Sequence, residues 1–199
     1  MAEGFRPLYT GIDLNGWKVE PGHEGHWRTN DWMLAYDGKS TATDKDLWTE
    51  KEFGDFVLIA DWRLRAETKK VPASADDGSR TPVEVQDAGQ SGILLRGSRK
   101  APIKIWSWPA GSGQVQSEET KQSPSARLAL TPRTKADKPV GEWNRFVITM
   151  RGDRVSVVLN GKMVIENAHV PGVPRRGPIG LQHHGDPIQF ANILVRELE

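Results

Sequence analysis

Two adjacent histidines, His183 and His184, stand in the stretch GPIGLQHHG at residues 177–185. Neighbouring side chains on a β-strand point to opposite faces, so the pair cannot hold one metal ion from a regular strand. One imidazole can therefore work as a proton acceptor or a ligand, while the other is packed or exposed. The plainer alternative is that both rings make ordinary hydrogen bonds where a strand ends.

Charged side chains inside apolar segments form a second group of candidates. Asp61 and Arg63 share one face of FVLIADWRL (56–64), and Arg96 follows two leucines in GILLRG. An arginine among apolar residues is costly unless it is paired or faces a polar cleft. We expect Asp61 and Arg63 either to form a salt bridge on a sheet surface or to serve a site, with the arginine setting the basicity of Asp61.

Tryptophan is abundant, with eight residues against two tyrosines. Most tryptophans fill core positions, but a tryptophan on an open face can stack on the apolar side of a sugar ring. Trp106 and Trp108 have the same parity in IWSWPAGSGQVQ (105–116) and would share a face of a regular strand. Two such residues are either core or the rim of a sugar site beside the Gly-Ser-Gly loop.

Several classes of site and partner are disfavoured. The chain has no cysteine, so disulfides and thiolate metal sites are excluded. His, Asp and Glu show no metal-like spacing, although a hard divalent cation such as calcium, held by scattered oxygens, would leave no linear motif. The net charge of +1 argues against nucleic acid or an anionic membrane as a partner. No apolar run approaches the roughly 18 residues of a membrane span, and residues 1–11 lack the apolar segment of a signal peptide.

The elements that must position these residues are predicted to be mostly strands. Residues 143–166 form a three-stranded antiparallel meander, in which Asn160-Gly161 suits a type I′ turn. Residues 43–53 resemble a short helix, and 66–90 and 109–125 are expected to be long irregular loops. Many short strands with hardly any helix predict one β-sandwich domain over residues 1–199; further strands are expected at 32–36, 56–64, 92–96, 103–107, 126–131, 178–183 and 187–196. In such a sandwich the two chain ends would pair in one sheet.

Five segments in order resemble the 3-keto-disaccharide hydrolase family of bacteria, long a domain of unknown function. They are FRPLYTGIDLNGWKV, LWTEKEFGDFVLIADWRL, QSGILLRG, GEWNRFVITMRGDRVSVVLNGKMV and GPIGLQHHGDPIQFANILVREL. The resemblance spans nearly the whole chain. It implies an all-β, concanavalin-like jelly-roll sandwich of two antiparallel sheets, one of them concave and carrying the site.

The resemblance also implies a carbohydrate ligand and a reaction on sugars already oxidised to a ketone at C3. The ketone acidifies the C2 hydrogen, a base removes it, the C1 substituent leaves, and hydration gives the free 3-keto sugar. Such a site needs a base, a cation or donors for the enolate oxygen, and a proton donor for the leaving group. We expect His184 or Asp61 to move the proton and Arg63 and Arg96 to contact oxygen; the residues expected to bind the sugar are Trp106, Trp108, Gln114, Gln182 and His183.

Two positions depart from the family's pattern. Gln114 stands where family members often have glutamate; it keeps hydrogen bonding but cannot take a proton at neutral pH. Ala191 stands where the family often has arginine, so no cation is expected there. These departures keep two alternatives open: a non-catalytic carbohydrate-binding module, favoured by Gln114, and an interaction domain whose concave face is filled by its own loops. Family members often carry signal peptides, which suggests a periplasmic or secreted protein, while the oligomeric state is left open.

Overall fold

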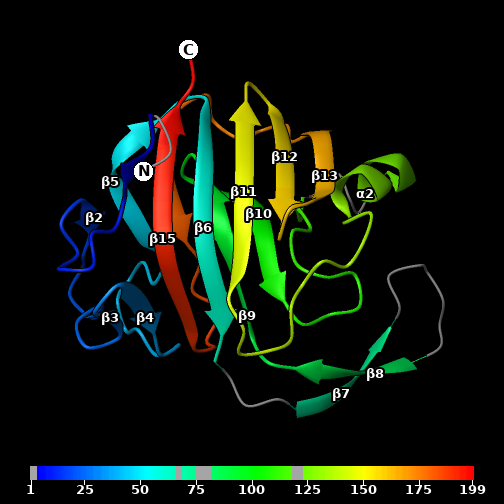
Figure 1. Ribbon diagram of the computed structural model, residues 1–199, viewed down its shortest axis with the longest axis horizontal. Coiled ribbons are helices and arrows are strands. Elements are labelled where there is room, and N and C mark those ends of the chain that lie inside the picture. The colour runs from blue at the N-terminus through cyan, green and yellow to red at the C-terminus, as the bar shows by residue number, and fades with distance from the viewer. Residues whose placement is uncertain (1–3, 66–68, 75–81, 118–122) are drawn as a thin grey trace.

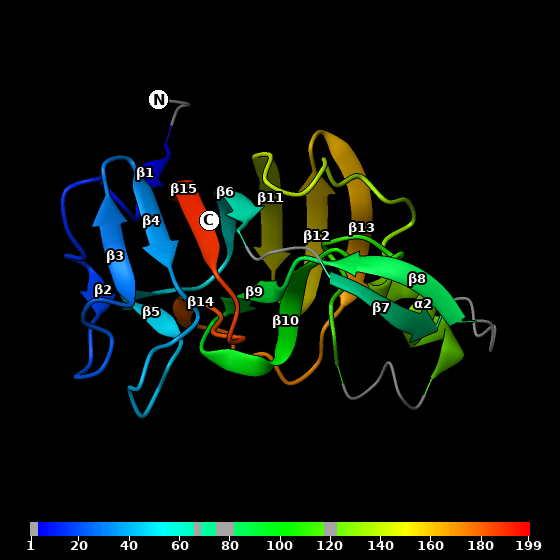
Figure 2. The ribbon, with the colours of Figure 1, turned by 90° about the horizontal axis from the view of Figure 1, so that it is seen from below.

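The computed structural model describes residues 4–65, 69–74, 82–117 and 123–199. Two antiparallel sheets stack face to face (Figures 1 and 2). Sheet A has the order β13 (Lys162–His169), β12 (Arg154–Leu159), β11 (Asn144–Arg151), β6 (Phe56–Leu64), β15 (Ile188–Glu197), β4 (Met33–Tyr36) and β3 (Trp27–Asn30), with β1 (Arg6–Pro7) paired to β15. Sheet B has the order β10 (Ser98–Trp106), β9 (Gln90–Leu95), β14 (Gly177–Leu181), β5 (Leu47–Phe53) and β2 (Trp17–Lys18).

The predicted meander is confirmed as β11, β12 and β13. Asn160 and Gly161 turn the chain between β12 and β13 with φ of 50° and 81°. A type I′ turn needs positive φ at both central residues, and asparagine and glycine tolerate it best. The expected pairing of the two chain ends is also confirmed, because Arg6 lies opposite Val195.

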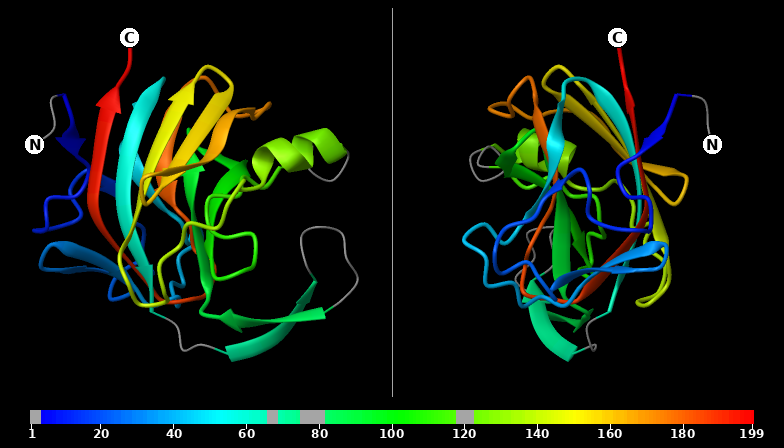
Figure 3. Two further views of the ribbon diagram at one scale, coloured as in Figure 1. Left: turned by 45° about the vertical axis from the view of Figure 1, so that its right-hand side comes forward. Right: turned by 90° about the vertical axis from the view of Figure 1, so that its left-hand side faces the viewer.

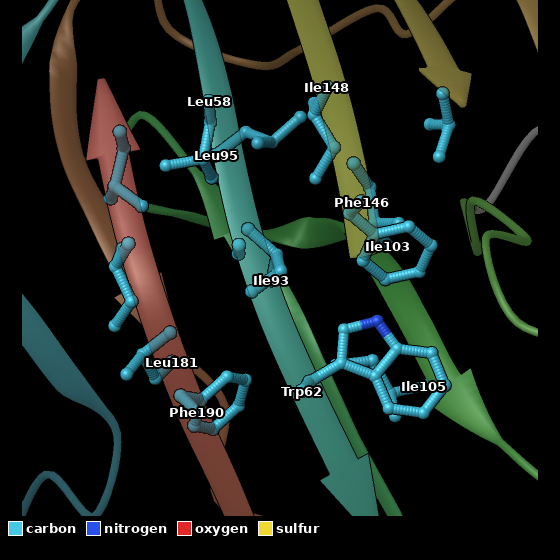
Figure 4. Close-up of a cluster of buried hydrophobic side chains, with 14 of the residues drawn as sticks. Leu58, Trp62, Ile93, Leu95, Ile103, Ile105, Phe146, Ile148, Leu181 and Phe190 are labelled. Atoms are coloured by element: carbon cyan, nitrogen blue, oxygen red, sulfur yellow. The ribbon is translucent and has the colours of Figure 1, made fainter. Parts of the chain in front are cut away.

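The hydrophobic core fills the space between the two sheets (Figure 4). Alternate residues of β6, including Leu58 and Trp62, face alternate residues of β9 and β10, including Ile93 and Ile103. Trp62 packs against Phe146 with ring centroids 5.5 Å apart. Each such large apolar side chain stabilises the fold by about 1.5–3 kcal/mol relative to exposure. This core fixes which face of every strand looks outward.

Three local predictions are wrong. Residues 126–131, expected as a strand, lie mostly in helix α2 (Pro124–Leu130), whose N-cap Ser123 accepts a hydrogen bond from the Ala126 amide. The alternation in ARLAL misleads because the cap and the proline at the helix start decide the local structure. The segment 43–53, expected as a helix, contains β5, since both sides of that strand pair with neighbours.

The third correction concerns the expected loop at 66–90. Its described residues form a hairpin of β7 (Lys69–Ser74) and β8 (Pro82–Asp87), and β9 begins at Gln90. Residues 66–68 and 75–81 of this loop, and 118–122 of the second one, lie outside the described residues. The hairpin and α2 project past the β10 edge of the sandwich, on the side of sheet B (Figures 2 and 3). They therefore flank the outer face of that sheet.

Candidate functional site

A row of four residues crosses the outer face of sheet B. Lys104 of β10 lies opposite Gly92 of β9. The Gln182 amide donates to the Gly92 carbonyl at 2.9 Å, and the Lys104 amide donates to the Gln114 carbonyl at 2.8 Å. Lys104 and Gly92 alternate with buried residues along β10 and β9, and Gln114 and Gln182 lie next to the core residues Val115 and Leu181, so the four residues point away from the core. We call Gln114, Lys104, Gly92 and Gln182 the sheet B row.

Gly92 is the floor of this row. A Cβ atom at position 92 would lie 2.6 Å from Oε1 of Gln182 and 2.9 Å from the Ile103 carbonyl oxygen. The side-chain amide of Gln182 therefore lies directly over the glycine, in space that the side chain of any larger residue would occupy. Oε1 of Gln182 is buried and has no hydrogen-bond partner. A buried acceptor without a donor costs about 1–3 kcal/mol, so a donor from outside the protein would be favoured there.

Lys104 is the second unsatisfied group of the row. Lys104 as a whole residue is only 4% exposed. In the described part of the chain, Nζ makes no hydrogen bond or ion pair. Burial lowers the pKa of Lys104, because a desolvated ammonium is disfavoured. Lys104 and Gln182 thus flank Gly92: Nζ of Lys104 is a donor without an acceptor, and Oε1 of Gln182 is an acceptor without a donor.

The two predicted rim tryptophans lie against each other, with ring centroids 5.9 Å apart. Trp106 is opposite Gln90 and two residues beyond Lys104, roughly 7 Å along the strand. Its Nε1 donates to the Gly111 carbonyl at 2.8 Å, whereas Nε1 of Trp108 is buried without a partner. Both rings are partly exposed, so the pair is a rim beside the row rather than part of the core.

Two hollows adjoin the row. One, of about 410 Å³, opens at the Gln182 end, and its lining residues are Thr43, Asp44, Lys45, Asp46, Arg99, Gln182 and His183. The other, of about 510 Å³, begins at Trp106 and runs under residues 135–142. Its lining joins the rings of Trp62 and Trp106 to the proline and valine of that loop. The larger hollow contains neither Lys104 nor Gln182, so we place the chemistry at the row and not there.

The adjacent histidines follow the end of β14 and have different surroundings. His183 turns toward Tyr36, whose hydroxyl hydrogen-bonds Nδ1, and the His183 amide donates to Oδ1 of Asp46 at 2.7 Å. Burial, aided by nearby Lys45, lowers the pKa of His183 and favours the neutral ring. His184 is exposed, and its ring makes no hydrogen bond within the described residues. It follows Gln182 by two residues, at the open end of the row.

Asp61 and Arg63 lie on the outer face of sheet A, across the core from the row. The expected Asp61–Arg63 salt bridge is wrong, because Asp61 pairs with Arg145 through two bonds of 2.6 and 2.7 Å. Asn192 donates a third bond of 2.7 Å to the same carboxylate. Arg63 instead donates to Oε1 of Gln189 at 2.7 Å, and its guanidinium lies 4.6 Å from the centroid of a Trp143 ring.

Arg96 lies at the far end of β9 from Trp106 and ties turns together. It donates to the carbonyls of Gly54 (2.7 Å), Gly152 (2.6 Å) and Pro174 (3.3 Å), and to Oδ1 of Asp55 (2.7 Å). Burial lowers its pKa, and the Asp55 carboxylate opposes that shift. All three guanidinium nitrogens are engaged within the protein. The structure therefore brings none of Arg96, Arg63 and Asp61 to the sheet B row, and Arg96 lies apart from the other two.

Sequence reasoning missed Lys104, Asp46 and Arg99. Lys104 could have been found, because it has the same parity as Trp106 and sits between two isoleucines in IKIW. Asp46 and Arg99 could not, since only the fold brings them to 2.6 Å. Arg99 also pairs with Asp44 and lies 5.2 Å from the centroid of the Trp48 ring. Both Arg99 and Asp44 line the 410 Å³ hollow.

The described residues contain no group of three or more His, Asp or Glu side chains that could hold a metal ion. No such cluster in the described residues therefore supports the expected divalent cation. Nor does any helix in the described segments have the length and apolar character needed to cross a membrane.

The comparisons with known proteins give the family and the fold of the chain. A family model described as "3-keto-alpha-glucoside-1,2-lyase-like domain" matches residues 4–196. The chain belongs to this family. The predicted family is thereby confirmed, and with it a domain type named for action on keto-glucosides. A search of curated proteins gave no match.

Solved structures confirm the predicted jelly-roll sandwich. A candidate glycosyl hydrolase from Parabacteroides distasonis has 23% identity and a TM-score of 0.68, over 98% of this chain and 84% of that one. A second one from the same organism has 21% identity and a TM-score of 0.66, over 100% and 95%. Carbohydrate-binding module CBM66 from Bacillus subtilis has 14% identity and a TM-score of 0.57, over 92% and 96%. At these identities the likeness establishes the fold alone.

The two departures from the family's pattern, Gln114 and Ala191, lie on different sheets. Gln114 belongs to the sheet B row, and its Nε2 reaches the Thr131 hydroxyl at 3.4 Å. Ala191 lies opposite Asp61 on sheet A, on the strand that flanks β6 on the other side from Arg145. An arginine at 191 would therefore stand beside the Asp61–Arg145 pair, away from the row. Only the substitution at 114 bears on chemistry at the row.

Proposed function

We propose that this chain acts on 3-keto-glycosides, with the sugar bound over Gly92 in the sheet B row. The observation that carries the proposal is a pair of unsatisfied side chains near Gly92. Oε1 of Gln182 has no donor, and the amino group of Lys104 has no acceptor. Buried polar groups of folded proteins are rarely left without partners, and those that are often mark sites that a ligand completes. A keto-sugar offers both a hydroxyl donor for Gln182 and a carbonyl acceptor for Lys104.

The proposed reaction is removal of the C2 proton followed by loss of the C1 substituent. His184 is the proposed proton acceptor, because its ring is free and stands at the open end of the row. Trp106 and Trp108 support the apolar face of the ring or of the leaving group. Gln114 holds a sugar hydroxyl at the opposite end. His183 positions this end of the site through Tyr36 and Asp46.

Asp61, Arg63 and Arg96 have no role in this proposal. Both oxygens of Asp61 are engaged by Arg145 and Asn192. Three of the Arg96 bonds go to backbone carbonyls that hold turns. The three residues therefore keep sheet A and the turns in place, and the sugar lies on the other sheet.

The test is product analysis with methyl 3-keto-α-glucoside and a 3-keto-disaccharide in D₂O, with and without chelator. We expect release of the C1 substituent and deuterium at C2 of recovered substrate. His184→Ala should lower turnover at least tenfold. His169→Ala is the matched control. His169 is an exposed histidine at the end of β13, and it pairs with Asp153. Loss of activity with chelator would add a divalent cation to the site.

A second function, a non-catalytic carbohydrate-binding module, is favoured by one observation. Gln114 replaces a carboxylate within the row itself, so a proton-transferring group is missing there. Saturable sugar binding without product or deuterium exchange would establish this alternative. Absence of binding to any glycan would instead favour an interaction domain.

A further inference from the structure

Lys104 is unlike the other lysines near the site. Lys45 and Lys100 are exposed, and their ammonium groups lie in water. Lys104 is 4% exposed and has no carboxylate partner in the described residues. A lysine held in a dry site with no counter-ion carries a larger share of neutral amine. A neutral amine is a nucleophile toward carbonyl carbon.

The nearest cross-strand neighbour of Lys104 is a glycine. Gly92 has no side chain, and the side-chain amide of Gln182 occupies the space above it. Gln182 also lines the 410 Å³ hollow. A sugar ring that displaces the Gln182 side chain toward that hollow would lie over Gly92, with Lys104 on one side and Gln182 on the other.

We propose that Lys104 forms a covalent imine with the C3 ketone of the bound sugar. The inference rests on the proposed function, because only a sugar oxidised at C3 presents that carbonyl. Lys104 would then be a catalytic residue and Gly92 a residue that keeps its approach open. The nitrogen takes over the electron-withdrawing role that the ketone oxygen has in the uncatalysed reaction.

The steps balance without an oxidant or reductant. The Nζ amine adds to C3, and uptake of one proton with loss of one water leaves a protonated imine. A base then removes the C2 proton, and the electron pair of that C–H bond forms the enamine. The enamine pushes electrons back through C2, the C1–O bond breaks, and the protonated base gives its proton to the leaving oxygen. One water hydrolyses the remaining protonated imine, which releases the unsaturated ketone, the free amine and the proton taken up in the first step.

The experiment is trapping with sodium cyanoborohydride, which reduces an imine to a stable secondary amine. The holoprotein is incubated with methyl 3-keto-α-glucoside and reductant, and its intact mass is measured. We expect one added sugar less one oxygen per chain, and peptide mapping should place it on Lys104. Absence of an adduct, or an adduct spread over exposed lysines such as Lys45 and Lys100, overturns the proposal.

Two variants separate covalent chemistry from charge. Lys104→Arg keeps a cation and cannot form an imine, whereas Lys104→Met keeps only the apolar stem. We expect both to lose the adduct and at least 100-fold in turnover while keeping the wild-type circular dichroism spectrum. Turnover retained by Lys104→Arg overturns the imine and leaves the proposed function intact. Turnover by the wild type without an adduct does the same. If a variant fails to fold, the adduct map of the wild type still decides.

A wild type without turnover gives a separate result. An adduct on Lys104 would then support the imine while the proposed function fails. If neither product nor adduct forms, both proposals are overturned.

Discussion

The outer faces of the two sheets treat charge in opposite ways. On sheet A, Asp61 is held by Arg145 and Asn192, and Arg63 by Gln189 and Trp143. On sheet B, Lys104 and Oε1 of Gln182 are buried with no such partners. A polar group that is satisfied within the protein has little left to offer a ligand. The unsatisfied face is therefore where we place the sugar, even though sheet A has more charged residues.

The largest expected effect on activity is at Gly92, the floor of the sheet B row. Gly92→Ala puts a methyl group 2.6 Å from Oε1 of Gln182 and 2.9 Å from a backbone carbonyl. We expect at least a 100-fold fall in kcat/KM for 3-keto-glucosides, about 2.7 kcal/mol of transition-state stabilisation. The control is Gly54→Ala, because the nearest atom to a Cβ at Gly54 is 3.9 Å away. Equal activity of the two variants would place the sugar elsewhere.

On sheet A the same kind of change should affect folding only. Asp61→Asn removes the charge that Arg145 meets, on a pair of which the arginine is half exposed. We expect a loss of about 1–2 kcal/mol in the free energy of unfolding, measured with urea, because the asparagine weakens two charged hydrogen bonds. Turnover per folded molecule should stay within twofold. A folded Asp61→Asn protein without turnover would return Asp61 to the catalytic site.

Gln182→Leu should move stability and binding in opposite directions. The variant removes a buried carbonyl that lacks a donor, so we expect a gain of about 0.5–1 kcal/mol in the free energy of unfolding. Sugar binding, measured by calorimetry, should weaken about tenfold because a hydrogen bond is lost. The row would have no special status if Gln182→Leu lost stability and kept its affinity.

The smallest expected effect concerns His183 and pH. Its pKa is lowered by burial, so the unfolded chain binds its proton more readily, and stability falls as pH drops below the ordinary value of about 6.5. Lys45 and His184 add to this shift, whereas Asp46 and Asp186 oppose it. Between about pH 7.5 and about pH 5.5 we expect wild type to lose up to about 1 kcal/mol more than His183→Gln in urea unfolding. Parallel pH profiles would show that His183 titrates alike in both states.

Much of the fold could be predicted from local pattern, and much of the site could not. The meander follows from β-branched alternation around an Asn-Gly turn, and the jelly roll follows from five ordered family segments. Helix α2 was missed because its N-cap, rather than its periodicity, decides the structure. Trp106 and Trp108 lie against each other as expected, although Trp108 lies beyond the end of β10, and His183 and His184 have different surroundings although both follow the end of β14. Local pattern could not show that Asp61 meets Arg145, since those residues are 84 positions apart and only strand pairing aligns them.

Arg96 has one more consequence. It holds the β5–β6 and β11–β12 turns at one end of the sandwich, whereas the sheet B row and the two tryptophans beside it lie toward the other end. The contacts that hold the turns and the proposed sugar site thus lie at opposite ends of β9. Changes to the loops around the rim should therefore leave the turns that Arg96 holds in place.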